Sequence, residues 1–433
     1  MSDRTGGGSS RFARRRLANW VTLGAAYSAL YLARYNLSLV SEPLSRAYGW
    51  SRAEVGTIVS VGFTVYGLAA AANGPLVDRI GGRRAMLIGL AGAAAANAAV
   101  GLTSYSGLPA SSLWWLLAAL WAVNGAFQSF SALSLVKVNA AWFGVRERGA
   151  FSAILTGLIQ CGRALVFVLG GVVLARASWA GMFVVPALVA AAAWVACRAV
   201  VRDTPTECGF DGPLDTGPAP VDARDATRAV LANPVVRAIG AAQLCTGIAR
   251  HGFEQWFPRY LVEVQHLRIE DQVFRDLGIA VVAASVLGAL AAGRLSDTRF
   301  GGRRAPAACA GYALQLAGCA AIAAGGGAAW LLAAFLAHAV GLMIVHSLLA
   351  GTAPMDFGGR AGAATAAGVF DGMHYLGGAI AGTGFGWLLD RAGWAAWAPA
   401  MMATSGVGLV LMLRLWRAVP STSPPEPAPG SPP

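Results

Sequence analysis

Two arginines lie within stretches that are otherwise apolar enough to cross a lipid bilayer. Arg34 falls in the segment WVTLGAAYSALYLARYNLSLV, and Arg250 falls in AIGAAQLCTGIARHGFEQWF. An arginine at the centre of a membrane-spanning helix costs roughly 2.5–3.5 kcal/mol on insertion scales. A chain that only had to reside in a bilayer would carry Leu or Ala at these positions. We therefore expect both guanidinium groups to face a wet central cavity and to bind an anion there.

Other polar residues flank each arginine at helical spacing. Tyr27 and Tyr31 share one helical face with Arg34, as expected for a cavity-lining stripe, although two core tyrosines would show the same spacing. Glu254 lies one turn after Arg250 and can pair with it, either as a static ion pair or as a group that binds protons.

A second group of ionisable residues lies late in the chain. Asp371, His374 and Tyr375 are spaced i, i+3 and i+4, which suits either a proton-sensing cluster or a structural Asp–His pair. Arg163 also falls within a span, as a third anion contact or as a partner of Asp371. His251 is expected to point about 100° away from Arg250 on the helix and to be peripheral.

The composition indicates an all-α membrane protein. The chain has 433 residues, of which 56% are hydrophobic and only 12% are charged. Soluble domains typically carry about a quarter charged residues. Here the apolar residues form blocks of about 20, the length of a helix that spans the bilayer.

Twelve transmembrane helices are expected, in two pseudo-symmetric six-helix halves. The spans are predicted near 17–40, 55–77, 84–103, 112–140, 149–175 and 178–200, and near 235–263, 276–296, 304–323, 328–350, 362–388 and 393–417. The predicted units are a basic cytoplasmic tail (1–16), an N-terminal half (17–200), a cytoplasmic linker (201–234), a C-terminal half (235–417) and a disordered Pro-rich tail (418–433).

The charge distribution predicts orientation and excludes nucleic acid as a partner. The net charge is +12, but many basic residues lie in short segments between apolar blocks, which is the positive-inside pattern. Basic residues at both ends of the chain place both termini in the cytoplasm. We expect a monomeric multi-pass protein of the cell membrane, as in a bacterial inner membrane.

The two halves contain a repeated loop. GPLVDRIGGRR (74–84) recurs as GRLSDTRFGGRR (293–304), and Arg34 and Arg250 both lie in the first span of their half. Internal repeats with a site at their interface, near the middle of the bilayer, are typical of secondary transporters.

These loops resemble the signature loop of the major facilitator superfamily, and the resemblance covers essentially the whole chain. It implies that Asp78 and Asp297 help to close one gate. The accompanying basic residues either join that gate or only determine topology; they are Arg79, Arg83, Arg84, Arg303 and Arg304.

Several segments are similar to the organophosphate:phosphate antiporters, the glycerol-3-phosphate and hexose-6-phosphate carriers. The matching residues are Tyr27-x-x-x-Tyr31-x-x-Arg34, Asn124-Gly125-x-x-Gln128, Trp142-Phe143…Glu147-Arg148-Gly149, Arg250-His251-Gly252 with Trp256-x-Pro258-x-Tyr260-Leu261, and GAATAAGVFDGMHYLGG (362–378). The resemblance implies that one arginine from each half binds the phosphate of the substrate, and that inorganic phosphate returns in exchange. It also implies that Gln128 contacts substrate and that Lys137 belongs to the cytoplasmic gate.

The chain departs from that family around the site. The family usually has Lys where this chain has Tyr35, another Lys where it has Ala70, and a site His where it has Ile159. The phosphate-binding pair is thus expected to be kept while the surrounding specificity residues differ, so a familiar sugar phosphate is not the expected substrate.

Three functions remain open from the sequence. The first is exchange of a phosphorylated or phosphonate-like metabolite for phosphate. The second is proton-coupled transport of an organic carboxylate, since Tyr31-x-x-Arg34-x-Asn36-Leu37-Ser38 also resembles anion:cation symporters. The third is a non-transporting membrane sensor of phosphate esters. No nucleophile motif, metal-ligand spacing or nucleotide-binding loop occurs, so we expect neither an enzyme nor a cofactor.

Overall fold

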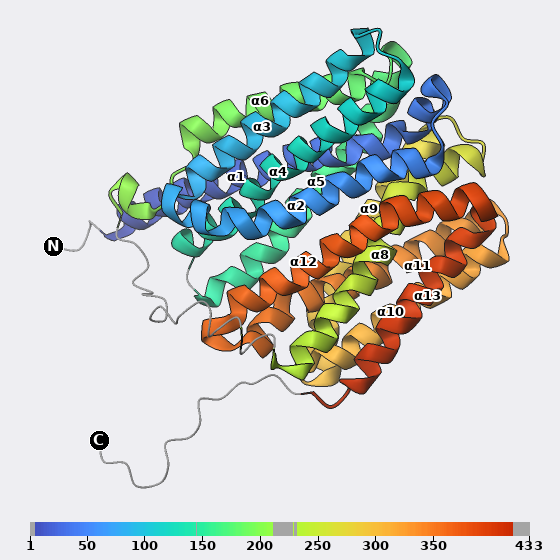
Figure 1. Ribbon diagram of the computed structural model, residues 1–433. Coiled ribbons are helices and arrows are strands. Elements are labelled where there is room, and N and C mark those ends of the chain that lie inside the picture. Colours follow the sequence, from blue (N-terminus) through green and yellow to red (C-terminus); the bar gives the residue numbers. More distant parts are fainter. Residues whose placement is uncertain (1–4, 144, 211–227, 229–231, 419–433) are drawn as a thin grey trace.

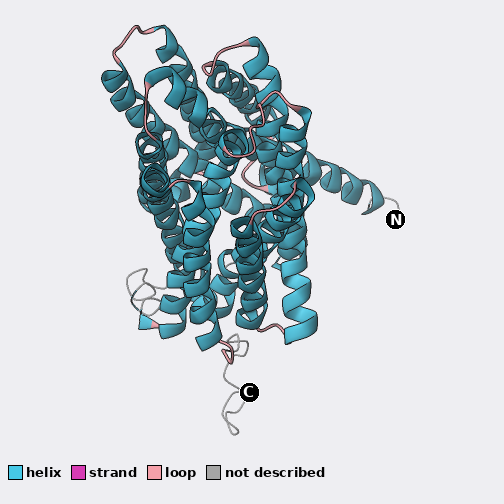
Figure 2. Cartoon of the chain, turned by 90° about the vertical axis from the view of Figure 1, so that its right-hand side faces the viewer, coloured by secondary structure: helices cyan, strands magenta, loops and turns pink. Residues whose placement is uncertain are grey.

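The computed structural model describes residues 5–143, 145–210, 228 and 232–418. Within these ranges the chain is helical with no strand, and loops join the helices (Figure 2). The helices of 18 or more residues are α1 (Thr5–Tyr48), α2 (Arg52–Ile80), α3 (Gly82–Leu102), α4 (Ala110–Trp142), α5 (Val145–Arg176), α6 (Gly181–Val200), α8 (Pro234–Glu263), α9 (Gln272–Arg294), α10 (Arg304–Ala324), α11 (Ala328–His346), α12 (Ala353–Ala392) and α13 (Trp397–Arg414). Each overlaps one predicted span, although α1 begins at Thr5, within the segment predicted as a basic tail. The predicted disordered tail and most of the predicted linker lie outside the described residues.

The helices form two bundles, α1–α6 and α8–α13, which lie side by side (Figure 1). Short 3₁₀ and π-helical segments join some of them: Thr103–Tyr105, Pro205–Cys208, Leu295–Arg299, Ser347–Thr352 and Trp394–Ala396. α11 continues through one of these, Ser347–Thr352, directly into α12, where the sequence predicted a break between spans.

The repeated loop makes a similar turn in each half. Gly81 follows α2 with φ +90°, and Gly301 and Gly302 precede α10 with φ +58° and +81°. Only glycine adopts such angles without strain, so the Gly-Gly step ends one helix and lets the next begin.

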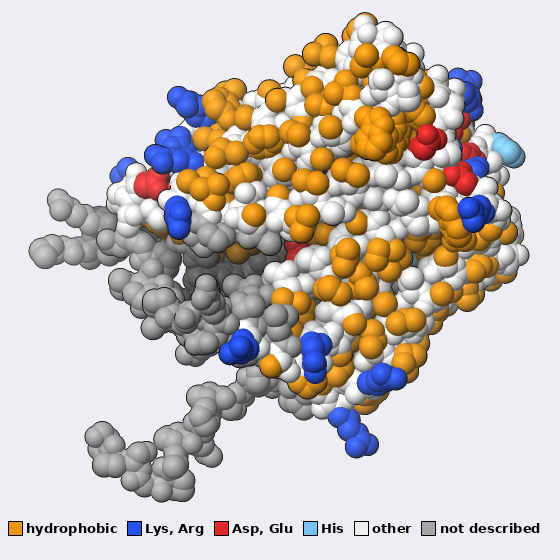
Figure 3. All heavy atoms as spheres, in the orientation of Figure 1, with side chains coloured by type: hydrophobic (Ala, Val, Ile, Leu, Met, Phe, Trp, Pro, Cys, Tyr) orange, Lys and Arg blue, Asp and Glu red, His pale blue; other side chains and the backbone are white. Residues whose placement is uncertain are grey.

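The long helices differ in their suitability for crossing a membrane. Among the described residues, eight helices are long and apolar enough to cross one: α2, α3, α4, α6, α9, α10, α11 and α13. The remaining long helices, α1, α5, α8 and α12, carry Arg34, Arg163, Arg250 with Glu254, and Asp371 with His374 in their middle turns. On the face that Figure 3 shows, apolar side chains form a broad band and charged ones gather toward the two ends. The polar interior is thus enclosed by apolar helices.

The two halves meet closely at the end of the bundle opposite the termini, here called the far end. There Arg52 on α2 pairs with Glu263 on α8 at 2.5 Å and with Asp390 on α12 at 3.5 Å. Gly56 and Gly382 let α2 and α12 touch, since a Cβ on Gly56 would lie 2.2 Å from the Gly382 carbonyl oxygen.

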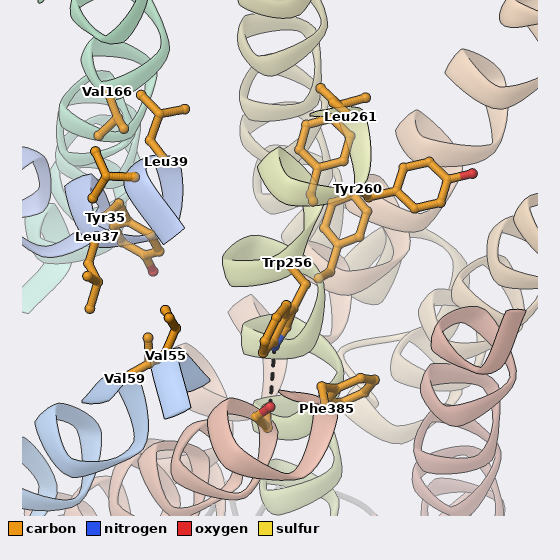
Figure 4. Close-up of a cluster of buried hydrophobic side chains, with 14 of the residues drawn as sticks. Tyr35, Leu37, Leu39, Val55, Val59, Val166, Trp256, Tyr260, Leu261 and Phe385 are labelled. Carbon is orange, nitrogen blue, oxygen red and sulfur yellow. Dashed lines mark hydrogen bonds between the residues drawn. The ribbon is translucent and has the colours of Figure 1, made fainter. Parts of the chain in front are cut away.

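Apolar packing continues from the far end toward the middle (Figure 4). Val55 and Val59 from α2 belong to the same buried cluster as Trp256 and Tyr260 from α8. The Trp256 indole donates to the Ala381 carbonyl of α12 at 3.4 Å. From this packed end the halves diverge toward the end at which the terminal segments lie (Figure 1).

Candidate functional site

Arg34 is 7% exposed and is held by contacts from both halves. Its Nε donates to Gln128 Oε1 at 2.8 Å, and its Nη1 donates to the Tyr375 hydroxyl at 3.3 Å. Within the described part of the chain, Nη2 of Arg34 is buried without a hydrogen-bond partner. An unpaired buried donor is costly, so this nitrogen is available to an acceptor that the protein itself does not supply.

Aromatic rings surround the same guanidinium. Its carbon lies 4.8 Å from the ring centre of Tyr66, 5.0 Å from that of Tyr31 and 5.9 Å from that of Tyr27. Cation–π contacts of this kind stabilise a positive charge away from water. A small cavity adjoins Arg34 and is also lined by Gln128 and by Gln255 of the other half.

Arg250 is 6% exposed and occupies the corresponding place in the other half. Its Nε donates to Glu254 Oε1 at 3.1 Å, so the i, i+4 pair expected from the sequence is present. Arg163 on α5 pairs with the same carboxylate oxygen, and its Nη2 donates to Ser285 at 3.2 Å. Of the two roles that the sequence left open for Arg163, the pair with Asp371 is not formed, since Arg163 pairs with Glu254 instead. Its role as a third anion contact stays a prediction.

Tyr35 completes the surroundings of Glu254. Its hydroxyl donates to Glu254 Oε2 at 2.8 Å across the interface between the halves. The sequence marked Tyr35 only as a departure from a family lysine. In the structure it is the third group that holds this buried carboxylate, after Arg163 and Arg250.

Three histidines gather beside Arg250. The ring centres of His346 and His374 lie 4.6 Å apart, and those of His374 and His251 lie 5.1 Å apart. His346 Nε2 lies 2.8 Å from Arg250 Nη1. The interpretation of His251 as peripheral was wrong: it is 2% exposed and packs on Phe63 of the other half at 4.2 Å between ring centres. Because other helices pack against α8 on more than one of its faces, a side chain about 100° away from Arg250 still lies in the interface between the halves.

Asp371 and His374 do not form the Asp–His pair that their spacing allowed. Asp371 is exposed, whereas His374 is buried and neither of its ring nitrogens has a hydrogen-bond partner among the described residues. Tyr375, next along α12, contacts Arg34, and its ring centre lies 4.2 Å from that of Tyr66. α12 therefore links the surroundings of the two arginines: Tyr375 contacts Arg34, and His374 packs on the histidine that contacts Arg250.

Comparison with known proteins identifies the family. The model of the major facilitator superfamily matches residues 23–382. The chain belongs to this superfamily. A bacterial homologue of the human lysosomal transporter Spinster has the same fold, with a TM-score of 0.69 at 14% identity, over 94% of this chain and 95% of that one.

Curated relatives of the chain belong to the organophosphate:phosphate antiporter family, which confirms the resemblance found in the sequence. A probable hexose phosphate transport protein of Chlamydia trachomatis is 24% identical over 93% of this chain and 91% of the relative. A glycerol-3-phosphate transporter of Bacillus subtilis is 25% identical over 94% and 93%. The membrane sensor protein UhpC of Escherichia coli is 23% identical over 93% and 92%.

The superfamily loops contact neighbouring helix ends. In the second half Arg304 pairs with Asp297 at 2.9 Å and with Asp356 of α12 at 2.7 Å. In the first half Arg83 donates to the Arg198 carbonyl at the end of α6 at 2.6 Å.

The other predicted gate residues are less connected. Arg79 and Arg84 are exposed, and Arg303 donates to the nearby Phe300 carbonyl at 3.2 Å. Lys137 donates to the Val77 carbonyl at 3.1 Å, near the end of α2. The side chain of Asp78 lies outside the described residues.

Sequence reasoning missed His346 and Gln255. His346 carried a usable signal, since it is an ionisable residue inside the apolar block 328–350. Gln255 carried no such signal. Nothing in the sequence around this glutamine, which follows Glu254, indicates that it lines the cavity beside Arg34 of the other half.

Proposed function

We propose that the protein is a secondary transporter that exchanges a small phosphorylated metabolite for inorganic phosphate by alternating access. The observation that carries this proposal is the pair of buried arginines, Arg34 and Arg250, on the equivalent first helices of the two halves, with Nη2 of Arg34 unpartnered among the described residues. A guanidinium presents a planar fork of donors that suits phosphate oxygens.

The charge of the site suits a phosphate ester. Arg34, Arg163 and Arg250 contribute three buried positive charges, and Glu254 removes one, which leaves two. A phosphate monoester carries about −1.5 to −2 at pH 7. A bound ester would offset most of this charge, whereas the empty site would have to cross the membrane with its charge exposed, so exchange is favoured over one-way movement.

The positive-inside pattern supports a cytoplasmic position for both termini, and hence for the open end of the bundle. The structure would then be the inward-open state of a monomer in the cell membrane. The packed far end, with Arg52, Glu263 and Asp390, would be the outer gate.

Counterflow on the purified, reconstituted protein tests the proposal. Vesicles loaded with phosphate should take up labelled phosphate, and a panel of unlabelled anions should compete. We expect three-carbon and sugar phosphates or phosphonates to compete better than carboxylates of the same size. Specific binding without any counterflow would favour a sensor, the function named for the relative UhpC.

A proton gradient alone should drive little uptake. Vesicles without internal phosphate are given an inward proton gradient and labelled substrate, and exchange requires an internal anion that is absent. Strong uptake under these conditions would contradict exchange and favour proton-coupled transport of an organic anion.

Gly56→Leu should abolish most exchange, because a side chain there collides with the Gly382 backbone and holds the far end open. We expect at least a tenfold fall in counterflow with normal protein yield. Gly406→Leu on α13 is the matched control, since nothing lies within 4 Å of a Cβ at that position. Equal activity of the two variants would exclude a far-end gate at Gly56.

A further inference from the structure

The contact between Arg250 and His346 determines the protonation state of the histidine. Arg250 Nη1 and His346 Nε2 lie 2.8 Å apart. A guanidinium only donates and stays protonated in proteins, so His346 Nε2 must accept. His346 is therefore neutral in this state, with its proton on Nδ1. That Nδ1 is buried and has no hydrogen-bond partner within the described ranges.

The surroundings of His346 disfavour a second positive charge while the site is empty. From α8 it faces Arg250 and His251, and from α12 it faces His374. Glu254 is already shared by Arg250 and Arg163. Tyr312, on the neighbouring α10, is bonded instead to Thr246 at 2.7 Å.

An anion bound to Arg250 would reverse this balance. Its negative charge offsets the positive charge of the guanidinium. Its oxygens accept the hydrogen bond that Arg250 Nη1 otherwise donates to His346 Nε2. The freed Nε2 can then bind a proton from the cavity water and donate it in a hydrogen bond to the same anion. When the anion leaves, His346 Nε2 releases its proton to water and again accepts the hydrogen bond from Arg250 Nη1.

We propose that His346 is a proton-binding site linked to Arg250. Each anion that binds at Arg250 is accompanied by one proton that binds to His346, and the anion and the proton cross the membrane together. This inference rests on the proposed exchange function. It requires the proton to accompany the anion in both directions, so it does not require a proton gradient to drive uptake. The linkage is reciprocal: a proton on His346 must raise anion affinity by the factor by which the anion raises proton affinity.

Calorimetry with the purified full chain and inorganic phosphate tests the linkage. Binding is measured in two buffers of different ionisation enthalpy, which gives the protons taken up per phosphate. The test variant is His346→Gln, whose amide oxygen can still accept from Arg250 but cannot bind a proton. His266→Gln, an exposed position between α8 and α9, is the control.

Wild type and His266→Gln should take up as much as one proton more per phosphate than His346→Gln. Between pH 8 and 6 their affinity should gain up to about tenfold per pH unit relative to His346→Gln, since one proton is linked to binding. Equal proton uptake in all three proteins would overturn the proposal.

A second measurement covers the case in which His346→Gln does not fold or bind. Sulfate stays a dianion over this pH range, so any pH dependence of the direct binding of labelled sulfate to wild type belongs to the protein. Tighter sulfate binding at pH 6 than at pH 8 supports the linkage, and identical binding at the two pH values overturns it. If folded wild type neither binds nor exchanges phosphate, the proposed function fails, and the linkage fails with it.

Discussion

Arg34→Lys should transport far less well than wild type, although it keeps the positive charge. Arg34 donates to Gln128 and Tyr375 and has a further nitrogen unpartnered among the described residues. A single ammonium cannot hold both neighbours and present a planar pair of donors to an anion. Loss of one charge-assisted hydrogen bond costs about 1.5–3 kcal/mol, and we therefore expect counterflow to fall by about 10- to 150-fold.

The control for this variant lies on the same helix. Arg46 has a side chain that is 78% exposed and pairs only with Glu42 one turn earlier within the described residues. Arg46→Lys should keep near-normal counterflow and yield. If Arg34→Lys exchanges phosphate as well as Arg46→Lys does, Arg34 does not bind the anion by its fork.

Glu254→Gln should strongly destabilise the protein. One carboxylate holds Arg163, Arg250 and Tyr35 in the interior, and its removal leaves two guanidinium groups without their counter-charge. Breaking a buried ion pair on one side typically costs about 3–5 kcal/mol. We expect a large fall in the midpoint of thermal unfolding in detergent, and added phosphate should restore stability in the variant more than in wild type.

A second variant separates charge from packing. Glu254→Gln combined with Arg163→Gln removes one charge of each sign and should recover a substantial part of the lost stability. Glu42→Gln, which breaks the pair with the exposed Arg46, should change the unfolding midpoint little. A midpoint for Glu254→Gln close to that of Glu42→Gln would contradict the central role given to this carboxylate.

The sequence alone predicted the features that depend on local chemistry. Blocks of about 20 apolar residues predict spans because a helix of that length crosses the hydrocarbon core. The repeated loop predicted two related halves, and the motifs around Arg34 and Arg250 predicted the family, which the comparisons confirm. The Arg250–Glu254 pair was also predictable, since residues four apart are neighbours on any helix.

The tertiary structure decided which residues from different helices meet. Arg163 pairs with Glu254 across 91 positions of sequence, His346 contacts Arg250 across 96, and Tyr35 contacts Glu254 across 219. Such contacts depend on the rotation and axial position of each helix against its neighbours, and these are determined by packing over the whole bundle rather than by the spacing within one span. For this reason the sequence located both arginines, but it offered Asp371 rather than Glu254 as the partner of Arg163, took His251 as peripheral and overlooked His346.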